Sequence, residues 1–188
     1  GRWGQDFTPW PGAETLRRVQ AITVDAEGVL WTARNGEHGL QRWMSGVPEL
    51  VLPAKAQLQD FRALAQLPDG TMLIGGAGGI YEWAGGKVVP AELPAAALGR
   101  TIHAFLVTGA EAWAGGDGGL LLHRVKGRWQ EVTHSYEVSA PFVSLARDDL
   151  GAIWIVARAG GLYRCADGTV SKAGLLGVAK RDMDLENV

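Results

Sequence analysis

A sequence pattern of about 41 residues occurs four times along the chain, and it constrains the fold more than any other feature. Its first marker is a bulky residue with successive spacings of 42, 40 and 41 residues, found at Trp31, Leu73, Trp113 and Trp154. Its second marker is a Gly-apolar pair with spacings of 40, 40 and 42 residues, found at 39–40, 79–80, 119–120 and 161–162. Two independent markers with one period indicate an internal repeat, as in solenoids and propellers.

Within each repeat, apolar and polar residues alternate with a period of two, which is typical of β-strands. Tight-turn residues follow the first strand at 25–28, 68–70 and 148–151, and a second turn precedes the last strand. In the second repeat we expect strands near 61–67, 71–75, 79–84 and 87–91, and a connecting loop rather than a helix at 94–98. Four antiparallel strands in about 41 residues predict an all-β chain of β-propeller blades.

The first strand of each repeat is expected to be the innermost strand of its blade, and the tryptophan of the second strand to fill the space between blades. We therefore interpret the chain as one propeller segment over 1–188. The expected blades are 19–52, 61–92, 102–133 and 142–175, with 1–10 as the end of a preceding blade and 176–188 as the start of a next blade or a tail. The segment is expected to belong to a larger propeller, and exposed ends would favour self-association or contact with neighbouring blades.

The first repeat contains a set of residues that fits the pattern V-x-x-I-x-x-D-x-x-G-x-L-W-I-G-T-x-x-G-G-L-x-R, namely Val19, Ile22, Asp25, Gly28, Leu30, Trp31, Thr32, Gly39, Leu40 and Arg42. The fourth repeat fits it at Val143, Asp148, Gly151, Ile153, Trp154, Ile155, Gly160, Gly161, Leu162 and Arg164. This pattern resembles the two-component-regulator propeller repeat over nearly the whole chain. The second repeat departs from it at Leu73, and the third lacks the Asp-x-x-Gly turn.

The resemblance implies a sensor region of a bacterial signalling protein, periplasmic or otherwise outside the cytoplasm, in a membrane-anchored parent. The output domain of such proteins is typically a histidine kinase or a GGDEF-type diguanylate cyclase. This sequence carries no motif of either output domain, so the segment itself is expected to be non-catalytic. Family members usually carry seven or fourteen blades, whereas four full repeats occur here.

Composition excludes several function classes. The formal net charge of -2 gives no basic field for nucleic acid. A single cysteine, Cys165, excludes an internal disulfide, and the four histidines lie far apart, without the spacing of a zinc helix. We therefore expect no metal, no cofactor and no catalytic nucleophile. No apolar run approaches the roughly 20 residues of a membrane helix.

The glycine-rich stretch at 73–86 raises the question of a phosphate-binding loop. It lacks the third glycine of G-x-G-x-x-G, and a strand pattern rather than a helix follows it. Similar glycines recur at 115–119 and 160–161, one repeat apart. The glycines are therefore interpreted as turn residues of a blade.

Propeller ligands usually dock where the loops between the second and third strands and the loops between blades emerge. Charged residues in these loops are the ligand-binding candidates: Arg34, His38, Asp60, Arg100, Asp117, His134 and Arg158. Arg34 and Arg158 follow their tryptophans by three and four residues, so we expect them at equivalent places, suited to a carboxylate or a sugar acid. The alternative is that these residues are solvated or form surface ion pairs. Polar residues of the inner strands, Arg62 and His103, are predicted to line the channel or to be satisfied locally.

Three functions remain open at this point. The first is a sensor module that binds a small molecule or saccharide, or signals through a partner. The second is a carbohydrate-active propeller hydrolase or lyase, for which Asp117, His38 and Asp60 are the residues to test. The third is a protein-interaction scaffold without a small ligand.

Overall fold

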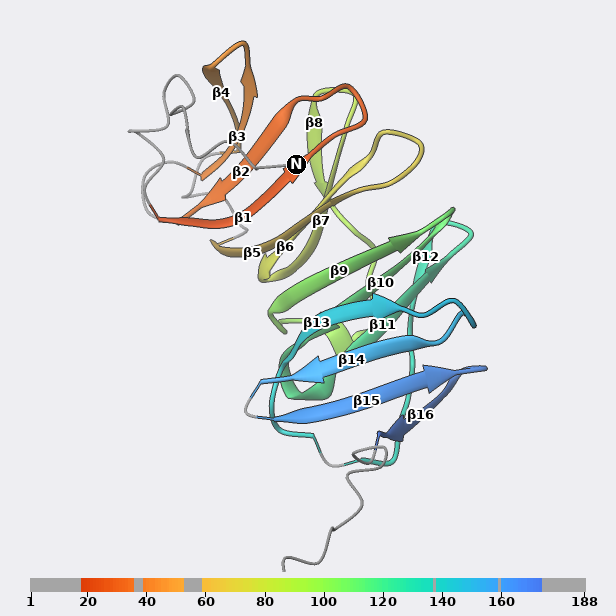
Figure 1. Ribbon diagram of the computed structural model, residues 1–188. Helices are drawn as coiled ribbons and strands as arrows, with labels where there is room; N and C mark the ends of the chain where they lie inside the picture. The colour runs from red at the N-terminus through yellow and green to blue at the C-terminus, as the bar shows by residue number, and fades with distance from the viewer. Residues whose placement is uncertain (1–17, 36–38, 53–58, 137, 159, 174–188) are drawn as a thin grey trace, which may run out of the picture.

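A computed structural model describes residues 18–35, 39–52, 59–136, 138–158 and 160–173. In this part of the chain, four antiparallel sheets of four strands account for nearly all regular structure (Figure 1). The fold is thus all-β, built from β-propeller blades, as the repeat predicted. The terminal stretches 1–10 and 176–188 lie outside the described residues.

Each blade contains four consecutive strands in sequence order. Blade 1 comprises β1 (Val19–Val24), β2 (Leu30–Arg34), β3 (Gly39–Met44) and β4 (Val47–Leu52). Blade 2 comprises β5 (Gln59–Gln66), β6 (Met72–Ala77), β7 (Gly79–Ala84) and β8 (Lys87–Pro90). Blade 3 comprises β9 (Ile102–Thr108), β10 (Glu111–Gly116), β11 (Leu121–Val125) and β12 (Arg128–Glu131). Blade 4 comprises β13 (Phe142–Arg147), β14 (Ile153–Ala157), β15 (Gly161–Ala166) and β16 (Thr169–Lys172).

The strands of blade 2 match the sequence expectation to within about two residues, the usual uncertainty of strand ends. The connecting stretch after β8 contains only a short 3-10 turn, η2 (Ala95–Ala97), and a second one, η3 (Asp117–Gly119), follows β10. The first strand of each blade is the innermost: β1 lies against β5, β5 against β9, and β9 against β13. Figure 1 shows these strands in succession, with blades 1 and 4 at opposite ends of an arc.

The Asp-x-x-Gly turn and the tryptophan of the repeat form one hydrogen-bonded unit. In blade 1, the Asp25 carboxylate accepts bonds from the backbone N–H of Val29 at 2.7 Å and from the Trp31 indole Nε1–H at 2.8 Å. In blade 4, the Asp148 carboxylate accepts the equivalent bonds from Ala152 N–H at 2.8 Å and Trp154 Nε1–H at 2.9 Å. The aspartate therefore closes the turn and fixes the indole ring, which in blade 1 packs against blade 2.

Each blade turns one sheet face, its trailing face, toward the following blade, and the other, its leading face, toward the preceding blade. Three buried clusters join the trailing face of one blade to the leading face of the next. Trp31 of blade 1 clusters with Phe61 of blade 2, and Trp113 of blade 3 with Phe142 of blade 4. Burial of these rings on both sides supplies the core that one blade lacks.

Leu73 replaces the tryptophan at the junction of blades 2 and 3, and the missing volume is supplied from the other side. Leu73 is fully buried in a cluster that includes Trp129 of the outermost strand of blade 3. Phe105 of β9 packs against this cluster, with its ring 6.3 Å from that of Trp129. The indole that fills this junction is therefore contributed by the following blade.

Two glycines of second strands, Gly75 of β6 and Gly115 of β10, allow the inner strand of the next blade to approach closely. A Cβ atom at Gly75 would lie 2.9 Å from both Ile102 Cγ2 and Phe105 Cε2 of the next blade. A Cβ atom at Gly115 would lie 2.8 Å from the backbone oxygen of Phe142. Real Cβ atoms essentially never come that close to another heavy atom, so a side chain at Gly115 would displace the backbone of Phe142 and one at Gly75 would displace the side chains of Ile102 and Phe105.

The trailing face of blade 4 is open. Strand pairing places Leu40, Ile80, Leu121 and Leu162 at one position of the four blades. The first three are at most 1% exposed, whereas Leu162 is 42% exposed, as is its cross-strand neighbour Val156. At the other end of the arc, Ile22 on the leading face of blade 1 is 63% exposed. The described blades therefore present an uncovered blade-packing surface at each end.

Candidate functional site

The candidate site is the edge of the arc formed by the β6–β7, β10–β11 and β14–β15 loops, together with Asn35 and Asp60 at the same edge of blades 1 and 2; we call this edge the rim. In blades 3 and 4, a backbone hydrogen bond ties this loop to the residue just before the inner strand. The N–H of Asp117 bonds to the oxygen of Thr101 at 3.0 Å, and that of Arg158 to the oxygen of Pro141 at 2.9 Å. The first residue after the second strand of these two blades is thereby held beside the start of the inner strand.

The predicted equivalence of Arg34 and Arg158 is wrong. Arg34 pairs with Gly39 as the last residue of β2, whereas in blade 4 the corresponding pair is Ala157 with Gly161. Arg158 therefore matches Asn35, one residue further along. Arg34 is only 2% exposed; burial lowers its pKa, and its Nη1–H donates to the Gln41 side chain at 3.3 Å. Its guanidinium is part of the blade interior rather than of the rim surface.

Asp60 connects blades 1 and 2 at the rim. Its carboxylate accepts a hydrogen bond from Asn35 Nδ2 at 2.7 Å, and another from Arg62 Nε at 3.0 Å. The residue also adopts a positive φ of 53°, an uncommon conformation for a residue with a side chain. Two neighbouring groups therefore already engage this carboxylate, and Arg62 is satisfied locally.

Asp117 organises the rim of blade 3. Its carboxylate accepts hydrogen bonds from His103 Nε2 at 2.7 Å and from the N–H of Thr101 at 3.2 Å. Arg100 Nη1 donates to the backbone oxygen of Asp117 at 3.2 Å. Burial would raise the pKa of Asp117, but the hydrogen bonds from His103 and Thr101 outweigh it, and the pKa is lowered. The carboxylate is thus held ionised, with almost half of its surface facing solvent.

His134 lies at the junction of blades 3 and 4. Its Nε2–H donates to the backbone oxygen of Gly119 at 2.9 Å, and its ring lies 5.9 Å from that of Phe142. Tyr136 and Tyr163 continue this aromatic group, with ring centroids 5.8 Å apart. His134 therefore positions the blade-to-blade crossing against the loop of blade 3.

A pocket of about 180 Å³ opens at the same junction; we call it the rim pocket. Its polar lining residues are Ser139 from the crossing, Arg158 from the β14–β15 loop and Tyr163 from β15. Arg158 is exposed, and among the described residues no side chain pairs with its guanidinium. One cation beside two hydroxyl groups suits an anionic or polyhydroxylated ligand.

The structure thus brings Arg158 and His134 to the junction of blades 3 and 4. Arg100 and Asp117 lie together at the rim of blade 3, and Asp60 lies between blades 1 and 2. His38 lies outside the described residues. Sequence reasoning missed Ser139 and Tyr163 as lining residues, although the Gly160–Gly161 turn marked the place. A Cβ atom at Gly161 would lie 2.7 Å from the Tyr163 ring, so the glycine makes room for that ring.

Two further features bear on chemistry. Within the described ranges, no group of three or more His, Cys, Asp or Glu side chains could hold a metal ion. Cys165 is 2% exposed, and its burial raises the pKa of its thiol. The nearby negative charge of Asp167 raises this pKa further, by a smaller amount. A buried thiol with a raised pKa is a poor nucleophile.

The sequence matches no protein-family model and no curated protein, but its fold is similar to solved structures. Virginiamycin B lyase from Staphylococcus aureus matches with a TM-score of 0.71 and 16% identity, over 85% of this chain and 56% of that one. The extracellular domain described as that of a one-component system from B. thetaiotaomicron matches with a TM-score of 0.69 and 16% identity, over 92% of this chain and 23% of that one. A hybrid two-component system from the same organism matches through its extracellular domain, with a TM-score of 0.67 and 17% identity, over 83% and 22%.

These likenesses show the fold, and they include both an enzyme and extracellular domains of signalling systems. The chain spans about half the length of the lyase and less than a quarter of the two signalling domains. In the described part of the chain, no helix is both long and apolar enough to cross a membrane.

Proposed function

We propose that this chain is the ligand- or partner-binding propeller region of a bacterial signal-transduction protein and does no chemistry by itself. The repeat resemblance, the likeness to extracellular signalling domains and the unpaired guanidinium of Arg158 in the rim pocket support this proposal. The rim pocket is the main support, because among the described residues no other side chain bonds to its guanidinium or hydroxyl groups. The ligand class is a small organic acid or an acidic saccharide.

The same proposal places the region outside the cytoplasm, in a membrane-anchored parent with a histidine kinase or GGDEF-type output domain. It also makes the four blades part of a larger ring. The open trailing face of blade 4 favours this, because Leu162 and Val156 occupy positions that are covered in the preceding blades. A following blade or another chain would bury them.

A thermal-shift screen of sugars, oligosaccharides and organic acids tests the ligand assignment. A ligand that binds the folded state stabilises it by RT ln(1 + [L]/Kd) and so raises the melting temperature as its concentration rises above Kd. The shift should disappear in Arg158→Gln and persist in Lys172→Gln, a matched removal of an exposed cation on the outermost strand of the same blade. A shift that survives Arg158→Gln would place the ligand elsewhere, and the absence of any shift would refute a small-molecule site at the rim.

A lyase or hydrolase is the second candidate, and one observation favours it. His103 and Asp117 form a pair at 2.7 Å at the rim, and a histidine oriented by a carboxylate is a common general base. The lyase among the structural neighbours makes such chemistry compatible with this fold. However, the Nε2 atom bonds the aspartate, and the His103 side chain is only 8% exposed, which limits access by a substrate.

Product formation distinguishes these candidates. A panel of glycosides and uronides incubated with the chain should give no product if the sensor proposal holds. Turnover that Asp117→Asn abolishes would favour the enzyme. Neither binding nor turnover, together with capture of a protein partner at the rim, would favour the scaffold.

A further inference from the structure

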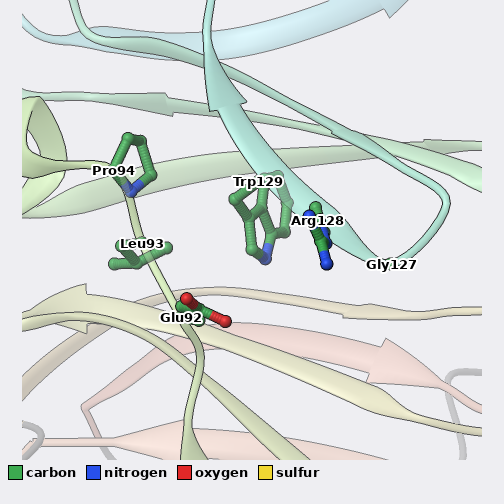
Figure 2. A pocket seen from close by; sticks show the side chains of 6 residues that line it. All are labelled: Glu92, Leu93, Pro94, Gly127, Arg128 and Trp129. Atoms are coloured by element: carbon green, nitrogen blue, oxygen red, sulfur yellow. The ribbon is translucent and has the colours of Figure 1, made fainter.

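A second cavity lies on the outer perimeter between blades 2 and 3, away from the rim; we call it the perimeter pocket. It measures about 280 Å³ and is lined from two sides (Figure 2). Glu92, Leu93 and Pro94 come from the crossing between blades, and Gly127, Arg128 and Trp129 from the β11–β12 hairpin. This hairpin lies at the opposite end of β11 from the rim loop, so the two pockets are separate.

The Trp129 indole is the unusual group in this pocket. The residue is 6% exposed, and its Nε1–H is buried without any hydrogen-bond partner. The indoles of Trp31, Trp43 and Trp154 all donate to an oxygen, at 2.8, 2.9 and 2.9 Å. A buried donor without an acceptor is costly, so an acceptor supplied by a ligand would be favoured at this atom.

Two opposite charges flank the indole. Figure 2 shows the Glu92 carboxylate and the Arg128 side chain on either side of Trp129, with the indole nitrogen turned toward the space between them. Among the described residues, neither Glu92 nor Arg128 forms a hydrogen bond or an ion pair through its side chain. Leu93 and Pro94 add an apolar wall. The pocket therefore offers donors for an anion, an acceptor for a cation and a surface for an aliphatic group.

We propose that the perimeter pocket binds a small zwitterion of the α-amino acid class. The carboxylate of the ligand accepts from Trp129 Nε1–H and Arg128, its ammonium group donates to Glu92, and its side chain lies against Leu93 and Pro94. The cavity volume of about 280 Å³ leaves room for a small ligand such as a mid-sized amino acid. The site is independent of the rim pocket and of whether the rim binds an acid or a saccharide.

Titration calorimetry of the intact chain with L-leucine as the probe tests the proposal. L-Leucinamide lacks the carboxylate and 4-methylpentanoate lacks the ammonium group, so each should bind at least tenfold more weakly than leucine. Glu92→Gln and Arg128→Gln should each weaken leucine binding by a similar factor. Both residues are exposed, so neither variant threatens folding. Trp129→Phe should also weaken it, whereas Arg158→Gln at the rim should not.

Three results would overturn the proposal. Leucine could give no saturable heat at millimolar concentration. Leucine affinity could stay unchanged in both Glu92→Gln and Arg128→Gln. Glucose, a neutral polyhydroxylated probe, could bind as tightly as leucine, which would assign the pocket to uncharged sugars instead.

Discussion

Leu121 and Leu162 occupy the same position in successive blades, and truncating each to alanine tests whether the trailing face of blade 4 is open. Leu121 is 1% exposed at the junction with blade 4, and Leu162 is 42% exposed. Leu→Ala in a packed core costs about 2–5 kcal/mol, because burial is lost and a cavity remains. We expect about 3 kcal/mol for Leu121→Ala. For Leu162→Ala we expect about 1 kcal/mol, because nearly half of the side chain is already in water and solvent fills the space.

Urea unfolding followed by circular dichroism measures both costs, as the change in the free energy of unfolding at constant m-value. The two variants remove the same atoms from the same strand position, so propensity effects cancel. Costs that agree within about 0.5 kcal/mol would refute the reasoning, since they would mean that Leu162 is as well covered as Leu121.

Three further changes test individual parts of the fold. Gly115→Ala should cost roughly 1–3 kcal/mol in urea unfolding, because the new Cβ would meet the backbone of Phe142 at 2.8 Å; an unchanged midpoint would contradict the close approach. Leu73→Trp should also destabilise by roughly 1–3 kcal/mol, since Trp129 already occupies that junction, whereas a gain in stability would show a void there. The pKa of Asp117 is lower in the folded than in the unfolded state, so its contribution to stability is present above the unfolded value of about 3.9 and is lost as pH falls through the folded value. Asp117→Asn should therefore flatten the acid limb of a plot of stability against pH, and a limb of unchanged steepness would contradict this.

The period of the repeat is sufficient to predict the blades, because four strands and a bulky residue in the second strand recur at nearly fixed spacing. It also located the Asp25–Trp31 and Asp148–Trp154 units, although not their direct hydrogen bonds. The second blade was placed to within about two residues from turn residues alone.

The site was harder to predict, since exposure depends on which blade covers a residue. Arg34 and Arg158 follow their tryptophans at nearly the same distance, yet one ends a strand and is buried while the other begins a loop. Trp129 fills the space that a tryptophan at position 73 would occupy. The two residues belong to different repeats, one in a second strand and one in an outermost strand, so the period does not reveal this contact. The rim pocket and the perimeter pocket are each lined by a crossing between blades together with residues of a blade, so the period does not reveal them either.

Ligand binding and turnover measured in one sample distinguish a binding module from an enzyme. Proton NMR of the first acid or saccharide that raises the melting temperature reports both, through line broadening on binding and through new signals on reaction. A binding module should give broadening that Arg158→Gln removes and Lys172→Gln retains, with the ligand spectrum otherwise unchanged over prolonged incubation. Appearance of a product that depends on His103 and Asp117 would contradict it and identify the propeller as an enzyme.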